Sequence, residues 1–150
     1  MLIWLKNRGK IRYRIFARRS INSIQRDSEG SYLAVSSRGN FYLTYKPGDE
    51  FWVPHNRETS RRITAMGFVK DRLVDGLWMS TAGGDISKTT GTVDTLAINI
   101  PFDKLQIRSG GYGILDVIFL ADGKTAWAVG GGGTIFGSTD GGATWQKVRV

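Results

Sequence analysis

The sequence predicts an all-β fold, a β-propeller made of four-stranded antiparallel blades. Three observations support this prediction. A strand-turn-strand pattern recurs three times, at spacings of 45 and 49 residues between its turn glycines. Glycine is abundant, at 20 of 150 residues, as expected for a chain with many tight turns. The segment 138–145 also fits the Ser-x-Asp-x-Gly-x-Thr-Trp pattern known as an Asp box. Four-stranded units of about 40 to 50 residues are typical of propeller blades.

Each repeat contains four short strands in the same order. The central pair covers 32–44, 77–89 and 126–138, with a turn that ends at a glycine. Each pair is preceded by an apolar strand, at 21–24, 63–66 and 114–117. A fourth strand follows, most clearly at 51–53 and 145–148. Each repeat therefore contains two antiparallel hairpins, which together form one blade.

The repeats divide the chain into three predicted blades, at about 20–62, 63–112 and 113–150, after a basic arm or edge strand at 1–19. Closed propellers have 4 to 8 blades, and the smallest ring needs on the order of 160 residues. Three blades are thus expected to form an incomplete ring. Further chain could fill the gap, a second copy could complete the ring by self-association, or the end strands could stay exposed.

The net charge of +8 is distributed unevenly. The first 19 residues hold seven lysines and arginines and no acid, whereas the remaining chain is close to neutral. The arm contains no nucleic-acid reading motif, so we expect no nucleic-acid partner. The sequence is also expected to carry no targeting signal and no transmembrane helix, because its apolar runs are too short.

Few residues are suited to catalysis. The chain has no cysteine, one histidine and three glutamates. Disulfides, thiolate nucleophiles and Cys- or His-rich metal sites are therefore excluded, and paired catalytic carboxylates have few candidates. We predict a protein that is not an enzyme and binds no metal.

The Asp box is predicted to stabilise a turn. An aspartate can accept hydrogen bonds from backbone N–H groups, a glycine tolerates the turn geometry, and the tryptophan can pack on the sheet. The box residues are Ser138, Asp140, Gly142, Thr144 and Trp145. The alternative is an Asp-box propeller fragment that binds glycans or resembles a glycoside hydrolase.

The most distinctive polar segment is rich in arginine. Arg57, Arg61 and Arg62 lie close together in the chain, and Arg38 occupies a turn of the first repeat. Turns of neighbouring blades share a rim, so these side chains are expected to gather where they can hold carboxylates of a partner in bidentate bonds. The alternative is a solvated loop whose arginines pair with Glu58.

Several motifs resemble the photosystem II stability/assembly factor family. They are Ser36-Ser-Arg-Gly-Asn-Phe41, His55-Asn-Arg57, Ser60-Arg-Arg-Ile63, Met66-Gly-Phe68 and Tyr112-Gly-Ile-Leu-Asp-Val117. The resemblance implies a seven-bladed propeller in the thylakoid lumen, of which this chain holds part. It also implies a non-enzymatic assembly factor that binds the newly made reaction-centre core subunit precursor and early assembly intermediates, and that meets the membrane only through the photosystem.

The resemblance further implies a partner-binding, arginine-rich face. The matching positions are Arg38, His55, Asn56, Arg57, Arg61 and Arg62, to which Arg26 is added as a further candidate. No cofactor is expected apart from a possible association with chlorophyll, which the resemblance suggests.

Overall fold

The computed structural model describes residues 21–36, 40–45, 51–55, 62–90, 93 and 100–149. The described residues form three four-stranded sheets and two short 3₁₀ segments, with no α-helix among them. No helix in this part of the chain is long and apolar enough to cross a bilayer. The predicted all-β class with four-stranded antiparallel units is confirmed.

Each sheet is an antiparallel meander whose strands follow the order of the chain. The first sheet comprises β1 (Ile21–Arg26), β2 (Tyr32–Ser36), β3 (Phe41–Leu43) and β4 (Val53–His55). The second comprises β5 (Ile63–Phe68), β6 (Leu77–Thr81), β7 (Ile86–Thr89) and β8 (Phe102–Lys104). The third comprises β9 (Ile114–Phe119), β10 (Ala126–Gly130), β11 (Thr134–Ser138) and β12 (Gln146–Lys147). The strands of each sheet fall inside one of the three predicted blade ranges, and the predicted arm at 1–19 lies outside the described residues.

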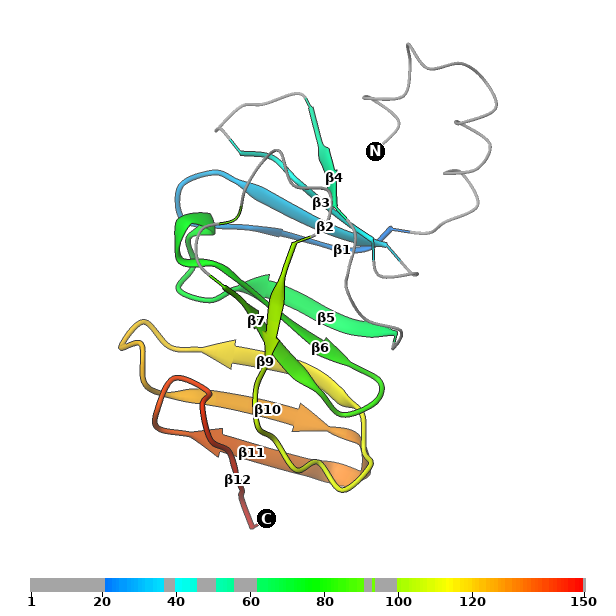
Figure 1. Cartoon of the computed structure of the whole chain (residues 1–150), viewed down its shortest axis with the longest axis vertical. Helices are drawn as coiled ribbons and strands as arrows, with labels where there is room; N and C mark the ends of the chain where they lie inside the picture. Colours follow the sequence, from blue (N-terminus) through cyan, green and yellow to red (C-terminus); the bar gives the residue numbers. More distant parts are fainter. Residues whose placement is uncertain are drawn as a thin grey trace.

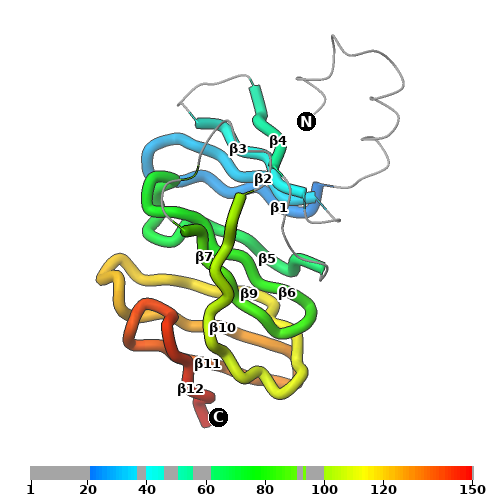
Figure 2. Tube along the Cα trace, viewed as in Figure 1, coloured from blue at the N-terminus to red at the C-terminus, as the bar shows by residue number. Residues whose placement is uncertain are grey.

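The three sheets are stacked in chain order along the long axis of the molecule (Figures 1 and 2). One buried apolar cluster lies between the first and second sheets and includes Leu33, Phe41, Met66 and Met79. A second joins the second and third sheets and includes Trp78, Ile86, Val117, Ala128 and Phe136. Because side chains alternate between the two faces of a strand, the middle sheet buries apolar residues on both faces.

The meander places equivalent parts of all three sheets along common edges. The strands β1, β5 and β9 begin at one edge, which we call the entry edge, and the β6–β7 and β10–β11 turns return to it. The opposite edge, here called the exit edge, carries the β1–β2, β5–β6 and β9–β10 turns and the Asp box. In Figure 1 the strands β5 and β9 start at the right and run towards the left.

Candidate functional site

The structure describes two of the six residues predicted to contact a partner, His55 and Arg62. Both lie at the entry edge, where β4 ends and β5 begins. The Arg62 side chain is exposed, and its carbonyl oxygen accepts a hydrogen bond from the backbone N–H of Ala82 at 2.9 Å. This bond ties the start of β5 to the β6–β7 turn. The other predicted residues, Arg38, Asn56, Arg57 and Arg61, lie outside the described residues.

His55 is buried inside the first sheet. Only 1% of the residue is exposed, and its ring stacks on Phe41 with 5.4 Å between ring centroids. Its Nε2 atom lies 2.8 Å from the hydroxyl of Tyr45. These contacts assign the imidazole a packing role between β3 and β4, whereas the sequence placed it among residues that face a partner. A polar residue in a polar segment gives no local sign of such burial.

Exposed arginines recur at the entry edge. Arg62, Arg108 and Arg149 are all exposed, and each follows the fourth strand of its sheet. The segment that contains Arg108 reaches this edge because Ser109 and Tyr112 lie directly against Gly84 in the β6–β7 turn. Arg149 reaches it because the N–H of Val148 donates to the carbonyl of Ile135, near the start of β11, at 2.8 Å.

An open groove of about 500 Å³ adjoins the last of these arginines. It is lined by Gly133, Lys147, Val148 and Arg149, so two cations face it. Arginine donates paired hydrogen bonds that match the two oxygens of a carboxylate. Sequence reasoning missed Arg108 and Arg149 because neither lies in an arginine-rich segment.

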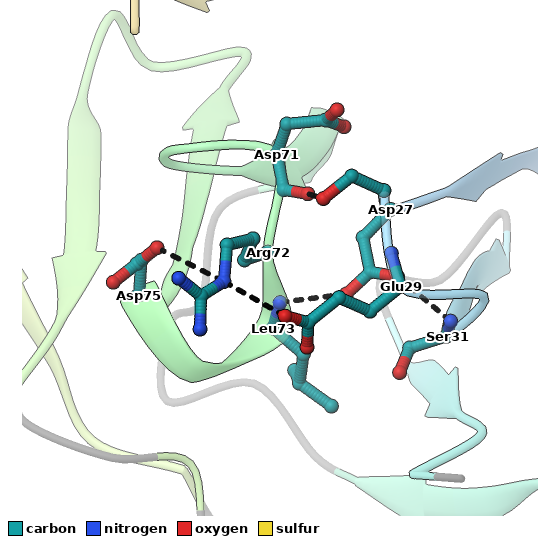
Figure 3. Close-up of polar contacts among 8 residues, drawn as sticks. Asp27, Glu29, Ser31, Asp71, Arg72, Leu73 and Asp75 are labelled. Atoms are coloured by element: carbon teal, nitrogen blue, oxygen red, sulfur yellow. Dashed lines mark hydrogen bonds and ion pairs between the residues drawn. The ribbon is translucent and has the colours of Figure 1, made fainter. Parts of the chain in front are cut away.

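At the exit edge, one arginine is paired with carboxylates of the chain. The guanidinium Nε of Arg72 lies 3.1 Å from a carboxylate oxygen of Glu29 and 3.8 Å from one of Asp75 (Figure 3). The buried carboxylate of Asp27 accepts hydrogen bonds from backbone N–H groups of both the first and second sheets. This edge therefore joins the first and second sheets, and Arg72 is already engaged by carboxylates of the chain.

The Asp-box segment, residues 138–145, forms a turn held by several hydrogen bonds. Asp140 accepts hydrogen bonds from the hydroxyl of Ser138 at 2.8 Å and the N–H of Thr144 at 2.9 Å, and its other oxygen accepts the Thr144 hydroxyl. Gly142 has a φ of 93° and donates its N–H to Ser138 Oγ at 2.9 Å. The indole N–H of Trp145 donates to the Gly142 carbonyl at 2.8 Å. The bond from the Thr144 hydroxyl is the main reason that the pKa of Asp140 falls to about 2.

A lysine of the second sheet attaches this box to its neighbour. Lys88 Nζ donates to the carbonyl of Gly141 at 3.1 Å and lies 5.1 Å from the centroid of the Phe119 ring. Burial, and secondarily the charge of Lys70, lowers the pKa of Lys88. Because the polar groups of the box are engaged within the chain, its geometry favours a structural role over glycan binding.

No metal centre emerges from the part of the chain that the structure describes. Within the described ranges, no group of three or more histidine, aspartate or glutamate side chains is placed to hold a metal ion. The arginines of the entry edge are therefore the arrangement with the clearest binding chemistry.

Comparison with known proteins identifies close relatives. Residues 13–150 match the family model described as photosynthesis system II assembly factor YCF48. The chain is 52% identical over 130 residues to the chloroplastic photosystem II stability/assembly factor HCF136 of Guillardia theta, covering 86% of this chain and 33% of that protein. It is 40% identical over 127 residues to the photosystem II assembly lipoprotein Ycf48 of Synechocystis, covering 83% of this chain and 34% of the relative. The chain thus spans about a third of the length of these relatives.

Solved structures agree with the fold. YCF48 from Cyanidioschyzon merolae matches with a TM-score of 0.79 and 43% identity, over 87% of this chain and 40% of the other. A structure of YCF48 bound to a D1 peptide matches with a TM-score of 0.67 and 35% identity, over 85% and 39% of the two chains. A WD40 domain of Sif2, 14% identical with a TM-score of 0.57 over 87% and 34%, shares the propeller fold alone.

Proposed function

The chain belongs to the photosystem II assembly factor Ycf48 family, and from this premise we propose that it binds a reaction-centre core subunit precursor through arginines of its entry edge. Relatives in the family are named as photosystem II assembly factors, and one solved relative carries a D1 peptide. D1 is therefore the partner that we propose for this chain, in its newly made form and in early assembly intermediates.

One observation points to particular residues for this contact. An exposed arginine follows the fourth strand in each of the three sheets, at Arg62, Arg108 and Arg149, so cations line the entry edge. Four described residues of the same edge are Ser36, Asn40, His55 and Arg62. They lie next in the sequence to the segments that contain the predicted contacts Arg38, Asn56, Arg57 and Arg61. A row of guanidinium groups suits a peptide with several carboxylates better than a compact ligand with one.

His55 has a supporting part in this proposal. Its buried ring fixes the end of β4, from which the segment 56–61 departs. We therefore separate it from the residues that touch the partner and treat it as a positioning residue.

The proposed action needs no chemical step by the chain. Holding a precursor segment requires affinity and release, and the names of the relatives describe assembly rather than catalysis. We place this activity at the thylakoid, on the lumenal side, with membrane contact only through the photosystem. Association with chlorophyll stays a prediction.

Binding of synthetic peptides tests the proposal. Peptides that together cover the lumenal segments of the D1 precursor are titrated against the chain and against Arg62→Ala, Arg108→Ala, Arg149→Ala and the triple variant. A lost charge-assisted hydrogen bond costs about 1.5 to 3 kcal/mol, so each single change is expected to weaken binding by roughly tenfold or more when the arginine contacts the peptide. The affinity is also expected to fall as salt is raised.

Two further variants serve as controls. Arg62→Lys keeps the charge but loses the bidentate geometry, so its affinity should lie between those of the wild type and Arg62→Ala. Lys124→Ala removes an exposed cation of the exit edge and should leave the affinity unchanged. Equal binding by the wild type and the triple variant at low salt would exclude these arginines as the contact.

A further inference from the structure

An aromatic side chain lies at the entry edge, at the junction between the second and third sheets. Tyr112 precedes β9 and begins the motif Tyr112-Gly-Ile-Leu-Asp-Val117, to which the proposed function assigns no contact. The residue is 48% exposed. A large ring that stays half exposed beside the arginines of this edge is a candidate contact for the same partner.

The Tyr112 ring is held against glycine backbone. A Cβ atom at Gly132 would lie 2.7 Å from the ring and one at Gly131 would lie 3.5 Å from it, so the ring packs directly on the main chain of this turn. The N–H of Gly131 donates to the carbonyl of Gly113 at 3.0 Å, which ties the turn to the residue after Tyr112. The carbonyl of Tyr112 lies against Gly84 in the β6–β7 turn. A side chain held in this way loses little conformational freedom when a partner contacts its open side.

The repeat makes Tyr112 the counterpart of a predicted partner contact. Arg62 and Gly113 each stand directly before the first strand of a sheet. The carbonyl of each accepts a backbone N–H from the turn between the second and third strands of that sheet, at 2.9 Å and 3.0 Å. The residue before Arg62 is Arg61, and the residue before Gly113 is Tyr112. Equivalent positions of one edge thus carry an arginine in one repeat and an aromatic residue in the next.

The surroundings of the ring favour an apolar contact. Arg108 is exposed and lies in the same segment as Tyr112. A tyrosine ring can also hold a cation, but the charge of Arg108 opposes the approach of one. Asp85 of the adjacent β6–β7 turn lies 3.4 Å from Lys104 Nζ, so its charge is already balanced. An aromatic or aliphatic side chain is the contact that gains most here, because it buries the open side of the ring.

We propose that the open side of the Tyr112 ring receives an aromatic or aliphatic side chain of the peptide whose carboxylates the entry-edge arginines hold. This inference rests on the proposed function and narrows it, because the bound segment must then combine apolar and acidic side chains. Tyrosine and arginine are both enriched among the residues that contribute most to binding at interfaces. Their contributions respond differently to salt, since only the attraction between charges is screened.

Titration of the D1-precursor peptides against variants of Tyr112 tests this inference. For the peptide that binds most tightly, Tyr112→Ala is expected to lower the affinity about tenfold, and Tyr112→Phe should stay within about twofold of the wild type because the ring remains. The loss for Tyr112→Ala should persist at high salt, whereas the loss for Arg108→Ala should shrink. Leu120→Ala, a change of an exposed apolar residue at the exit edge, should leave the affinity unchanged.

Changes in the peptide separate a direct contact from an effect on the fold. Each apolar residue of the peptide is replaced in turn by alanine, and each product is titrated against the wild type and Tyr112→Ala. One replacement should weaken binding to the wild type about tenfold but hardly affect binding to Tyr112→Ala, because the contact is already lost there.

The outcomes distinguish this inference from the proposed function. Unchanged affinity of Tyr112→Ala, together with weakened binding by Arg62→Ala or Arg108→Ala, would overturn the inference and leave the proposed function standing. Additive losses for Tyr112→Ala and every peptide replacement would also overturn it, because the ring would then act only through the fold. Absence of peptide binding by the wild-type chain would overturn both.

Discussion

The backbone N–H of Leu73 donates a hydrogen bond to Oδ2 of Asp27 at 2.8 Å, across the junction between the first and second sheets. The other oxygen of this buried carboxylate accepts the N–H groups of Ser31 at 2.7 Å and Glu29 at 3.0 Å. One side chain thereby shapes its own turn and fixes the neighbouring sheet (Figure 3). The Asp27 carboxylate thus forms a polar contact between the first and second sheets at the exit edge.

Replacing Asp27 by asparagine should separate these two functions of the carboxylate. The asparagine carbonyl can still accept from Ser31, but its NH₂ group then faces the N–H of Leu73, so two donors meet in a buried site. The expected loss is about 2 kcal/mol in the free energy of unfolding, measured in urea. Asp122→Asn is the matched control, because Asp122 forms a similar turn within one exposed loop. Equal losses for both variants would contradict a clamp between sheets.

Gly67→Ala should disturb the contact between the second and third sheets. A Cβ atom at Gly67 would lie 2.7 Å from Nε1 of Trp78, which is too close for the indole to keep its place. Trp78 packs near Phe119 of the third sheet, so its displacement loosens that contact. We expect a loss of about 1 to 3 kcal/mol in the free energy of unfolding and a changed tryptophan emission.

The matched control for this change is Gly131→Ala. Its new Cβ would lie 3.5 Å from the nearest atom, in the ring of Tyr112, which is an ordinary contact. Its effect should stay within about 0.5 kcal/mol. An equally small loss of stability for Gly67→Ala would show that the position of the Trp78 ring does not depend on the absence of a Cβ atom at residue 67.

A substitution of His55 tests whether its ring serves to pack the first sheet or to contact the partner. His55→Phe keeps an aromatic ring on Phe41 but loses the hydrogen bond to the Tyr45 hydroxyl, so unfolding should become easier by about 1 kcal/mol. The peptide affinity of the folded variant should remain within about twofold of the wild-type affinity, as expected for a buried ring that does not contact the peptide. A stable variant with tenfold weaker peptide binding would instead assign the ring to the interface.

The parts that could be predicted from the sequence are those with a local pattern. The Asp box is a contiguous motif, so the bonds of Asp140 with Ser138 and Thr144 follow from residue types four positions apart or fewer. The bond between Asp27 and Leu73 joins positions 46 residues apart and has no pattern of its own. The burial of His55 depends on rings supplied by Phe41 and Tyr45, which only the folded sheet brings together. The predicted contacts Arg38, Asn56, Arg57 and Arg61 stay predictions.

The Asp box should make stability depend on acid pH. The pKa of Asp140 is lowered from 3.8 to about 2 in the folded chain, chiefly by the hydrogen bond from the Thr144 hydroxyl. A carboxyl group with a lower pKa in the folded state stabilises the fold above its unfolded pKa, and that contribution is lost as the pH falls towards about 2. The free energy of unfolding should therefore decrease between about pH 5 and about pH 2.

Two substitutions of Thr144 test this origin. Thr144→Val removes the hydroxyl, so the pKa of Asp140 should rise towards its ordinary value and the acid-dependent loss of stability should shrink. Thr144→Ser keeps the hydroxyl and should retain the low pKa. Carboxyl carbon shifts followed by NMR report the titration of Asp140, and Asp122 serves as an internal reference because its pKa is also lowered to about 2, mainly by the hydroxyl of Thr125. An Asp140 titration that is the same in both variants would show that the backbone bonds alone set the pKa.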